Sequence, residues 1–129
     1  MQIFVSYAAK DRDYARALSN HLAKHGLRAW TFEDEILPGD NVWLRAGEAM
    51  KTSRAMVVLL SPDSVHSEFV RREVEYALGN PAYQGRVFPI LVRRTKDIPW
   101  ILRKLKILDG KKSAAKLAAS IAESLEQAA

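Results

Sequence analysis

The sequence predicts an α/β protein of the flavodoxin-like type, a three-layer sandwich with helices on both faces of a five-stranded parallel sheet of strand order 2-1-3-4-5. Segments rich in β-branched and aromatic residues alternate with amphipathic helical segments along the whole chain. The segment AMVVLL, residues 55–60, is continuously apolar, as is typical of a strand buried on both faces. Because ligands of such folds bind beyond the carboxyl ends of the strands, we expect a site in the loops after the first three strands.

The first strand is expected at residues 2–7, where QIFVSY is β-branched and aromatic. Asp11 is placed to cap the helix that follows, and Gly26 is expected to end that helix. The second strand, LRAWTF, is expected at residues 27–32, and the polar segment EDEILPGD, residues 33–40, is expected to form a loop.

The remaining elements continue the alternation of helix and strand. They are expected as a helix from about Asn41 to Thr52, the strand at 55–60, a helix beginning after Ser67, a strand at 86–92 (RVFPILV), a short strand near 105–108 (LKIL) and a final helix from about Ser113. Helices thus follow all of the expected strands except the one at 86–92, and this alternation favours parallel strand pairing.

Glu73 stands out in the helical segment SEFVRREVEYAL, residues 67–78. At about 100° per residue, Val70 and Val74 fall on one apolar stripe, and Glu73 projects at the margin of this stripe. No basic residue lies three or four positions away on the helix to neutralise it. Because burying an unpaired carboxylate is costly, either a distant Arg or Lys pairs with Glu73 or its charge is used in a solvent-filled pocket.

The composition of the chain excludes several classes of protein. A length of 129 residues and 48% hydrophobic content fit a single domain spanning residues 1–129. The longest apolar run is far too short to span a membrane, and the first residues show no signal peptide, so we expect a cytoplasmic protein without a membrane partner. The absence of cysteine excludes disulfides and thiolate chemistry, and His21 and His25 have no evident third ligand, so no metal site is expected.

The charges and glycines exclude further functions. The net charge is +5, and residues 93–112 hold eight basic and two acidic residues, but Trp100 is their only interleaved aromatic. A solvated surface is therefore favoured, and nucleic acid is not expected as a partner. The six glycines form neither a dinucleotide-binding nor a phosphate-binding loop. The acidic residues that a bacterial receiver domain needs after its first and third strands are not at the required positions.

Four segments of the chain carry motifs of one known family. IFVSYAAKD, residues 3–11, is similar to the first conserved box of Toll/interleukin receptor (TIR) domains of the bacterial type, and GLRAWTFEDEILPGD, residues 26–40, is similar to the second strand and BB loop of these domains. SRAMVVLLSPDSVHSEFVRREVEYAL, residues 53–78, resembles the third strand and the helix after it, and IPWIL, residues 98–102, resembles the third box. The order and spacing of these segments cover nearly all of the chain.

This resemblance implies an activity. Many TIR domains cleave NAD+ between nicotinamide and ribose, and they use a glutamate in a W-x-x-x-E pattern on the helix after the third strand. Phe69 and Glu73 match this pattern, so the resemblance implies that Glu73 is catalytic and that Phe69 packs beside the substrate. NAD+ is then the substrate, the products are nicotinamide and ADP-ribose or a cyclic ADP-ribose, and no cofactor is required.

The resemblance also implies how the substrate is held. The further substrate-binding residues that it implies are Ser6, Tyr7, Ala8, Asp34, Glu35, Leu37 and Pro38. Some relatives carry a basic residue where this chain has Ala8, and Tyr7 is equally well explained as an aromatic that packs on the sheet. Self-association with other TIR domains through the BB loop, Glu33–Asp40, is expected to activate the enzyme, in bacterial immunity or virulence.

Two other functions stay open. The chain can be a non-enzymatic scaffold, because animal-type TIR domains signal by self-association without chemistry. It can also be a nucleoside deoxyribosyltransferase-like enzyme, which has a related fold and uses a glutamate but acts on deoxynucleosides. A carboxylate at the margin of the core favours an enzyme over a scaffold.

Overall fold

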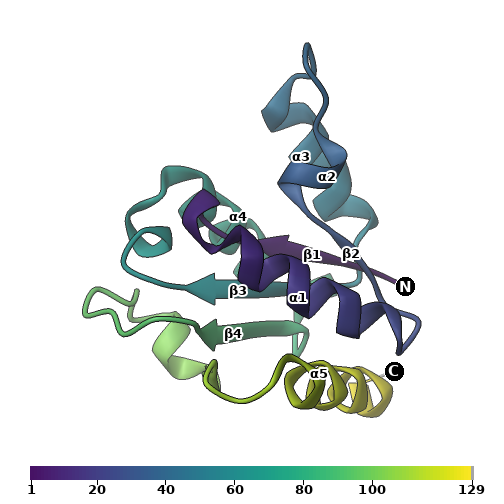
Figure 1. Ribbon diagram of the computed structural model, residues 1–129. Coiled ribbons are helices and arrows are strands. Elements are labelled where there is room, and N and C mark those ends of the chain that lie inside the picture. Colours follow the sequence, from purple (N-terminus) through teal and green to yellow (C-terminus); the bar gives the residue numbers. More distant parts are fainter. Residues whose placement is uncertain (129) are drawn as a thin grey trace.

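The computed structural model describes residues 1–128, and Ala129, the last residue of the predicted domain, lies outside the described residues. It contains a five-stranded sheet of order β2-β1-β3-β4-β5, in which every neighbouring pair is parallel (Figure 1). The strands are β1 (Gln2–Ser6), β2 (Arg28–Trp30), β3 (Ala55–Leu60), β4 (Val87–Leu91) and β5 (Leu108–Asp109). The predicted flavodoxin-like topology is confirmed.

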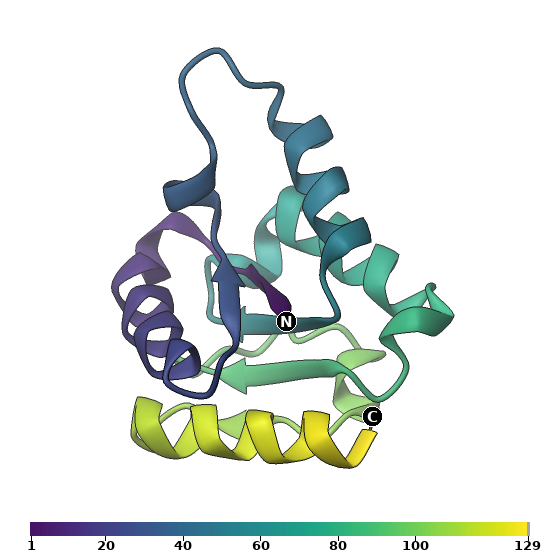
Figure 2. The same cartoon turned by 90° about the vertical axis from the view of Figure 1, so that its right-hand side faces the viewer.

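Helices cover both faces of the sheet, as Figures 1 and 2 show. The helices are α1 (Arg12–Ala23), α2 (Phe32–Glu35), α3 (Val42–Thr52), α4 (Glu68–Leu78) and α5 (Ala114–Ala128). Alternate residues of β1 point to opposite faces, so that Ile3 packs with α1 and α5 while Phe4 packs with α3 and α4. All six residues of β3 are buried, which confirms the prediction of a strand covered on both faces.

The structure corrects two predictions near the ends of β1 and β2. The second strand ends at Trp30, and Phe32 begins the single helical turn α2 where an extended chain was expected. Asp11 does not cap α1 with its side chain. Its buried carboxylate instead accepts a hydrogen bond from the Ser61 hydroxyl and pairs with Arg93 at 3.1 Å. These tertiary partners take the carboxylate away from the helix terminus.

The segment between α2 and α3 projects from the body of the molecule (Figures 1 and 2). Leu37 at this projection is 62% exposed, and Gly39 turns the chain with a φ of +90°. The Asp40 carboxylate accepts a hydrogen bond from the Leu37 backbone N–H at 2.8 Å, which closes the turn. Most of the segment predicted as a BB loop is therefore an ordered projection.

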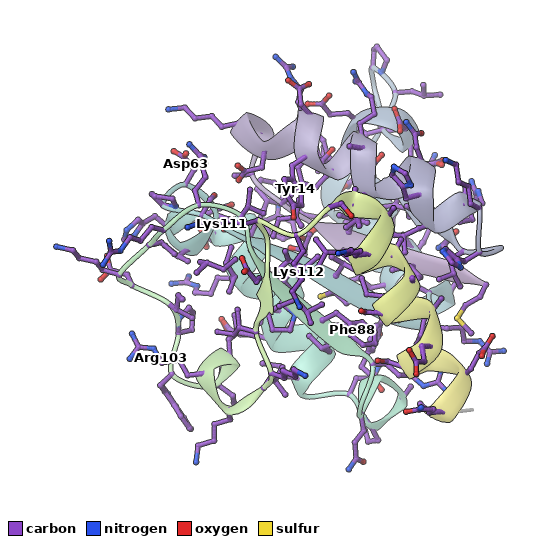
Figure 3. The ribbon with its side chains drawn as sticks, turned by 60° about the horizontal axis from the view of Figure 1, so that its bottom comes forward. Tyr14, Asp63, Phe88, Arg103, Lys111 and Lys112 are labelled. Atoms are coloured by element: carbon purple, nitrogen blue, oxygen red, sulfur yellow. The ribbon has the colours of Figure 1, made fainter. Side chains whose placement is uncertain are left out.

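The basic segment, residues 93–112, lies on both sides of β5. Figure 3 shows Arg103, which belongs to the 3-10 helix at Leu102–Lys104, and it shows Lys111 and Lys112 on the loop after β5, with Tyr14 of α1 beside that loop. The Tyr14 hydroxyl donates a hydrogen bond to the carbonyl oxygen of Gly110 at 2.9 Å, which anchors this loop to α1. Within residues 1–128, no helix has the length and apolar character needed to cross a membrane.

Gly110 is the glycine at which we expect substitution by alanine to be tolerated least. A β-carbon added there would lie 2.1 Å from the carbonyl oxygen of Leu91, whereas one added at Gly47 of α3 meets nothing within 4 Å. Gly110→Ala should therefore destabilise the domain by on the order of 3 kcal/mol. Gly47→Ala should stabilise it by about 0.5–1 kcal/mol, because alanine favours the helix. Urea unfolding of both variants tests this, and equal stabilities would contradict the β4–β5 packing described here.

Candidate active site

A pocket of about 250 Å³ opens at the carboxyl ends of β1 and β2, beside the first turns of α4. This is the edge of the sheet at which the sequence predicted a site. The pocket is lined by Val5, Tyr7, Ala8, Ala9, Trp30, Phe32, Glu33, Ser67, Phe69 and Glu73. Its walls are mostly apolar and aromatic, and it contains two carboxylates.

Glu73 is placed in this pocket by the packing of α4. The Ser67 hydroxyl caps the helix by accepting a hydrogen bond from the Val70 backbone N–H at 3.3 Å. Val70 and Val74 bury the inner stripe of the helix, and Glu73 beside them is only 8% exposed. The helical period that singled out Glu73 in the sequence thus corresponds to a position at the edge of the core.

Within residues 1–128, the Glu73 carboxylate has one protein hydrogen-bond donor and no ion-pair partner. The Ser6 hydroxyl, at the end of β1, donates to its Oε1 atom at 2.7 Å. Across residues 1–128, none of the salt bridges involves Glu73. Of the two interpretations that the sequence left open, pairing with a distant Arg or Lys is therefore not what the structure shows.

Burial raises the pKa of Glu73 from its usual value of 4.5 to about 7, and the Ser6 hydrogen bond partly opposes this shift. The carboxylate is therefore close to half ionised at neutral pH. A cation that entered the pocket would favour the ionised form, because no protein cation competes for it. Such a perturbed carboxylate at the wall of an apolar pocket is a candidate catalytic group.

Aromatic rings form the outer wall of the pocket. The Phe69 ring, 40% exposed, is stacked on Trp43 of α3 with ring centroids 4.2 Å apart. The Arg72 guanidinium lies 5.2 Å from the Trp43 ring centroid on the same cluster. Trp30 is buried and stacks on Phe4 at 4.9 Å, so it belongs to the core as much as to the pocket. The exposed face of the Phe69 ring can stack against a flat ligand.

Tyr7 and Glu33 also line the pocket. The Tyr7 hydroxyl accepts a hydrogen bond from the Glu33 backbone N–H at 3.3 Å, which ties the end of β1 to α2. Burial raises the pKa of Tyr7 above its usual value of 10.0, so this hydroxyl is neutral. The Glu33 carboxylate lies 3.7 Å from Arg12 and 4.0 Å from Arg16, both on α1.

The structure brings together part of the predicted site. Tyr7, Ala8, Phe69 and Glu73 line the pocket, and Ser6 lies behind it in contact with Glu73. The other predicted residues, Asp34, Glu35, Leu37 and Pro38, do not line it.

These four residues have other surroundings. The Asp34 carboxylate accepts a hydrogen bond from the Thr31 hydroxyl at 2.9 Å, and Glu35 pairs with Arg28 at 3.0 Å. Leu37 and Pro38 lie exposed on the projecting segment. Their predicted contact with a nucleotide stays a prediction.

Sequence reasoning missed Phe32, Glu33 and Ser67 as lining residues. The signal that could have identified Phe32 and Glu33 is their place directly after the second strand, at the ligand-binding edge. They were instead assigned to the end of an extended strand and to the loop. Ser67 belongs to the loop after the third strand, where a site was expected, but it was not named as a binding residue; it caps α4 and also lines the pocket.

A second hollow, of about 330 Å³, lies at the opposite end of α4 and is lined by residues between 77 and 87 and by Leu105. It is lined by no Asp, Glu, His, Lys or Arg, so it offers no acid or base for chemistry apart from the Tyr83 hydroxyl. That hydroxyl already donates a hydrogen bond to the carbonyl oxygen of Met50 at 2.5 Å. In the part of the chain that the structure describes, no group of three or more His, Asp or Glu residues is arranged to hold a metal ion.

Comparison with known sequences identifies a family and several similar proteins. A sequence model of the TIR domain family matches residues 3–128. The protein named "Probable 2' cyclic ADP-D-ribose synthase TcpO", from Methanobrevibacter olleyae, is 30% identical over 90 residues, which cover 69% of this chain and 26% of that protein. The NAD(+) hydrolase PdTIR from Paracoccus denitrificans is 28% identical over 98 residues, which cover 74% of this chain and 32% of that protein.

Solved structures show the same fold. The TIR domain of the Toll-related receptor TRR-2 from Hydra magnipapillata superposes with a TM-score of 0.77 at 20% identity, covering 98% of this chain and 95% of that one. A prokaryotic SEFIR domain superposes with a TM-score of 0.63 at 15% identity, covering 98% of this chain and 88% of that one. The chain spans only about a quarter to a third of the length of the curated relatives above.

The raised pKa of Glu73 predicts a pH-dependent stability. Between pH 4.5 and about 7 the folded state holds a proton on Glu73 that the unfolded state has released, so the free energy of unfolding falls as pH rises through this window. The loss amounts to on the order of 3 kcal/mol. Glu73→Gln removes it, so the variant should gain stability over the wild type between pH 5 and pH 8 in urea titrations.

The control for this experiment is Glu75→Gln, which removes a carboxylate from the exposed face of the same helix. Parallel stability curves for the wild type and Glu73→Gln across this pH range would show that Glu73 is well solvated in the folded domain.

Proposed function

Since the chain belongs to the TIR domain family, we propose that it is an NAD+ nucleosidase in which Glu73 stabilises the transition state for loss of nicotinamide. The observation that carries the proposal is a desolvated carboxylate in the wall of an aromatic pocket, with no ion-pair partner among the described residues. The names of two relatives, an NAD(+) hydrolase and a 2' cyclic ADP-D-ribose synthase, support it at 28% and 30% identity.

The reaction needs only one carboxylate. In NAD+ the nicotinamide is attached to ribose as a cationic pyridinium, and when the C–N bond breaks both bonding electrons pass to the ring nitrogen. The leaving group is then neutral and requires no proton, unlike the alkoxide released in ordinary glycoside hydrolysis. Positive charge moves to the ribose ring, and a nearby carboxylate in a water-poor site stabilises it.

Glu73 meets these requirements by its position and surroundings. Its burial leaves it poorly solvated, so its attraction for a cation is stronger than that of a surface carboxylate. The Ser6 hydroxyl holds one carboxylate oxygen in place by a hydrogen bond. Among the described residues the other oxygen has no hydrogen-bond partner, so it is available to the substrate. Water that adds to the ribose carbon loses a proton to solvent and yields ADP-ribose, whereas capture by a group of the same nucleotide yields a cyclic product.

The aromatic wall provides the binding site for the nicotinamide ring. A pyridinium cation is attracted to the face of an aromatic ring, and Phe69 presents an exposed face at the pocket. Trp43 supports Phe69 from behind by stacking. Phe69 occupies the place at which the family pattern has tryptophan, and it keeps the aromatic face without an indole N–H.

We also propose that assembly of TIR domains controls the activity. The segment between α2 and α3 projects from the body of the molecule in Figure 1, and its residue Leu37 is exposed. A solved assembly that includes the TIR domains of the Roq1 resistosome superposes with a TM-score of 0.59 at 19% identity, covering 95% of this chain and 70% of that one. The Glu33–Asp40 segment is the surface through which a second copy would act.

Glu73→Gln should abolish nicotinamide release from NAD+ by the concentrated or artificially clustered domain, with a loss of roughly 100-fold or more. The glutamine preserves the shape of the side chain and its capacity to accept the Ser6 hydrogen bond, but it carries no charge. Chromatographic measurement of nicotinamide gives the rate, and Glu75→Gln serves as the charge control.

Equal turnover by the wild type and Glu73→Gln would overturn the mechanism. If the clustered wild type forms filaments but releases no nicotinamide, the domain is a scaffold. If it exchanges the base of deoxynucleosides and leaves NAD+ intact, it is a deoxyribosyltransferase.

The rate should depend on pH through Glu73. Because the ionised form is the active one and its pKa is about 7 in the free domain, kcat/KM should rise with pH and level off above about pH 7. Ser6→Ala removes the hydrogen bond that lowers this pKa, so the rising limb should move to higher pH. If kcat/KM rises at the same pH in Ser6→Ala as in the wild type, the group that titrates is not Glu73.

A further inference from the structure

The pocket is too small for the whole substrate. Its volume of about 250 Å³ lies below the roughly 300–1,000 Å³ of pockets that enclose drug-sized ligands. NAD+ is larger than most such ligands, so on the proposed function the pocket holds the nicotinamide riboside part. The diphosphate and the adenosine must then lie across its rim.

The pocket itself repels a diphosphate. Its ionisable lining residues are Glu33, Glu73 and Tyr7, and it contains no Lys or Arg. The loop directly after β1 contributes only the apolar Ala8 and Ala9 to the wall. Positive charge for the phosphates must therefore come from residues just outside the pocket.

Arg12 and Arg16 stand at the rim on the side of Glu33. They are one turn apart on α1, on the same helical face, and each side chain is 60% exposed. A small hollow lined by both arginines, Tyr7 and Glu33 adjoins the pocket, so Glu33 forms the wall between the two. Figure 2 shows α2, which carries Glu33, next to the start of α1.

The other cations near the pocket have different partners. Lys10 lies 3.8 Å from Asp63, which does not line the pocket. Arg72 pairs with Glu68 at 3.0 Å and covers the Trp43 ring. Among the described residues, Arg12 and Arg16 thus differ from these cations, because their ion-pair partner is itself a lining residue of the pocket.

We propose that Arg12 and Arg16 bind the diphosphate of the dinucleotide, and that Glu33 holds them in place until the substrate takes them over. The pairs with Glu33, at 3.7 and 4.0 Å between exposed side chains, are long and weak. Arginine binds phosphate oxygens through shorter, charge-assisted and often bidentate hydrogen bonds. Exchange of Glu33 for a diphosphate is therefore favourable, and Glu33 acts as a competitor that the substrate displaces.

Steady-state kinetics with two substrates test this proposal. NAD+ and nicotinamide riboside share the same scissile bond, but only NAD+ carries a diphosphate. In Arg12→Gln/Arg16→Gln, KM for NAD+ should rise by roughly tenfold for each arginine lost. The preference for NAD+ over nicotinamide riboside should fall accordingly. Glu33→Gln should have the opposite effect and lower KM for NAD+.

The control is Arg71→Gln/Arg86→Gln, which removes the same net charge from positions outside the pocket. This variant should keep the preference of the wild type for NAD+. An equal rise of KM in both double variants would mean that only the net charge matters, and this result overturns the proposal.

Binding of ADP-ribose, measured by calorimetry, separates this proposal from the nucleosidase proposal because it requires no turnover. The wild type and Glu73→Gln should bind ADP-ribose, and Arg12→Gln/Arg16→Gln should bind it roughly 100-fold more weakly. Arginine-dependent binding without NAD+ turnover would refute the nucleosidase and leave the diphosphate site standing. The diphosphate site alone is overturned if turnover depends on Glu73 but the arginine substitutions leave the affinity for ADP-ribose unchanged. It is likewise overturned if turnover depends on Glu73 but the wild type shows no detectable binding of ADP-ribose.

Discussion

The hydrogen bond between the Ser6 hydroxyl and the Glu73 carboxylate, 2.7 Å long and almost shielded from solvent, is the interaction on which the rest of the site depends. It joins the end of β1 to the inner side of α4, two elements that the parallel sheet brings together at its carboxyl edge. One neutral hydroxyl is a weak substitute for the hydration shell that the carboxylate has lost. The site is therefore poised to bind positive charge, because an arriving cation relieves a cost that the protein leaves uncompensated.

The packing of α4 against the sheet imposes this desolvation cost on Glu73. Val70, Val74 and Ala77 bury the inner stripe of α4 against the sheet, and this burial fixes where Glu73 must lie. The Ser67 cap fixes where the helix begins and hence the angle at which Glu73 meets the pocket. At neutral and alkaline pH the ionised Glu73 therefore makes the structure near the site less stable than its hydrophobic packing alone would make it. Such a loss of stability is common at functional sites.

Much of the fold and the position of Glu73 could be predicted from the sequence, because the periodicity of a helix or strand is a local property. The apolar run of β3, the starts of α3 near Asn41 and of α4 after Ser67, and the anomalous place of Glu73 all follow from spacing along one element. The loops were less predictable, because their conformation depends on distant residues. Asp11 has the sequence of a cap, but Ser61 and Arg93 engage it from other loops, and the α2 turn directs Phe32 and Glu33 into the pocket where an extended chain was expected.

The most direct test of the account is to titrate the side-chain carboxyl carbon of Glu73 by NMR, with and without 1-methylnicotinamide, a pyridinium cation that lacks a scissile glycosidic bond. We expect a pKa of about 7 for Glu73 in the free domain and a lower pKa once the cation fills the pocket. A pKa close to 4.5 that does not respond to the cation would show that the carboxylate is already well solvated or neutralised, and would contradict the role given to Glu73.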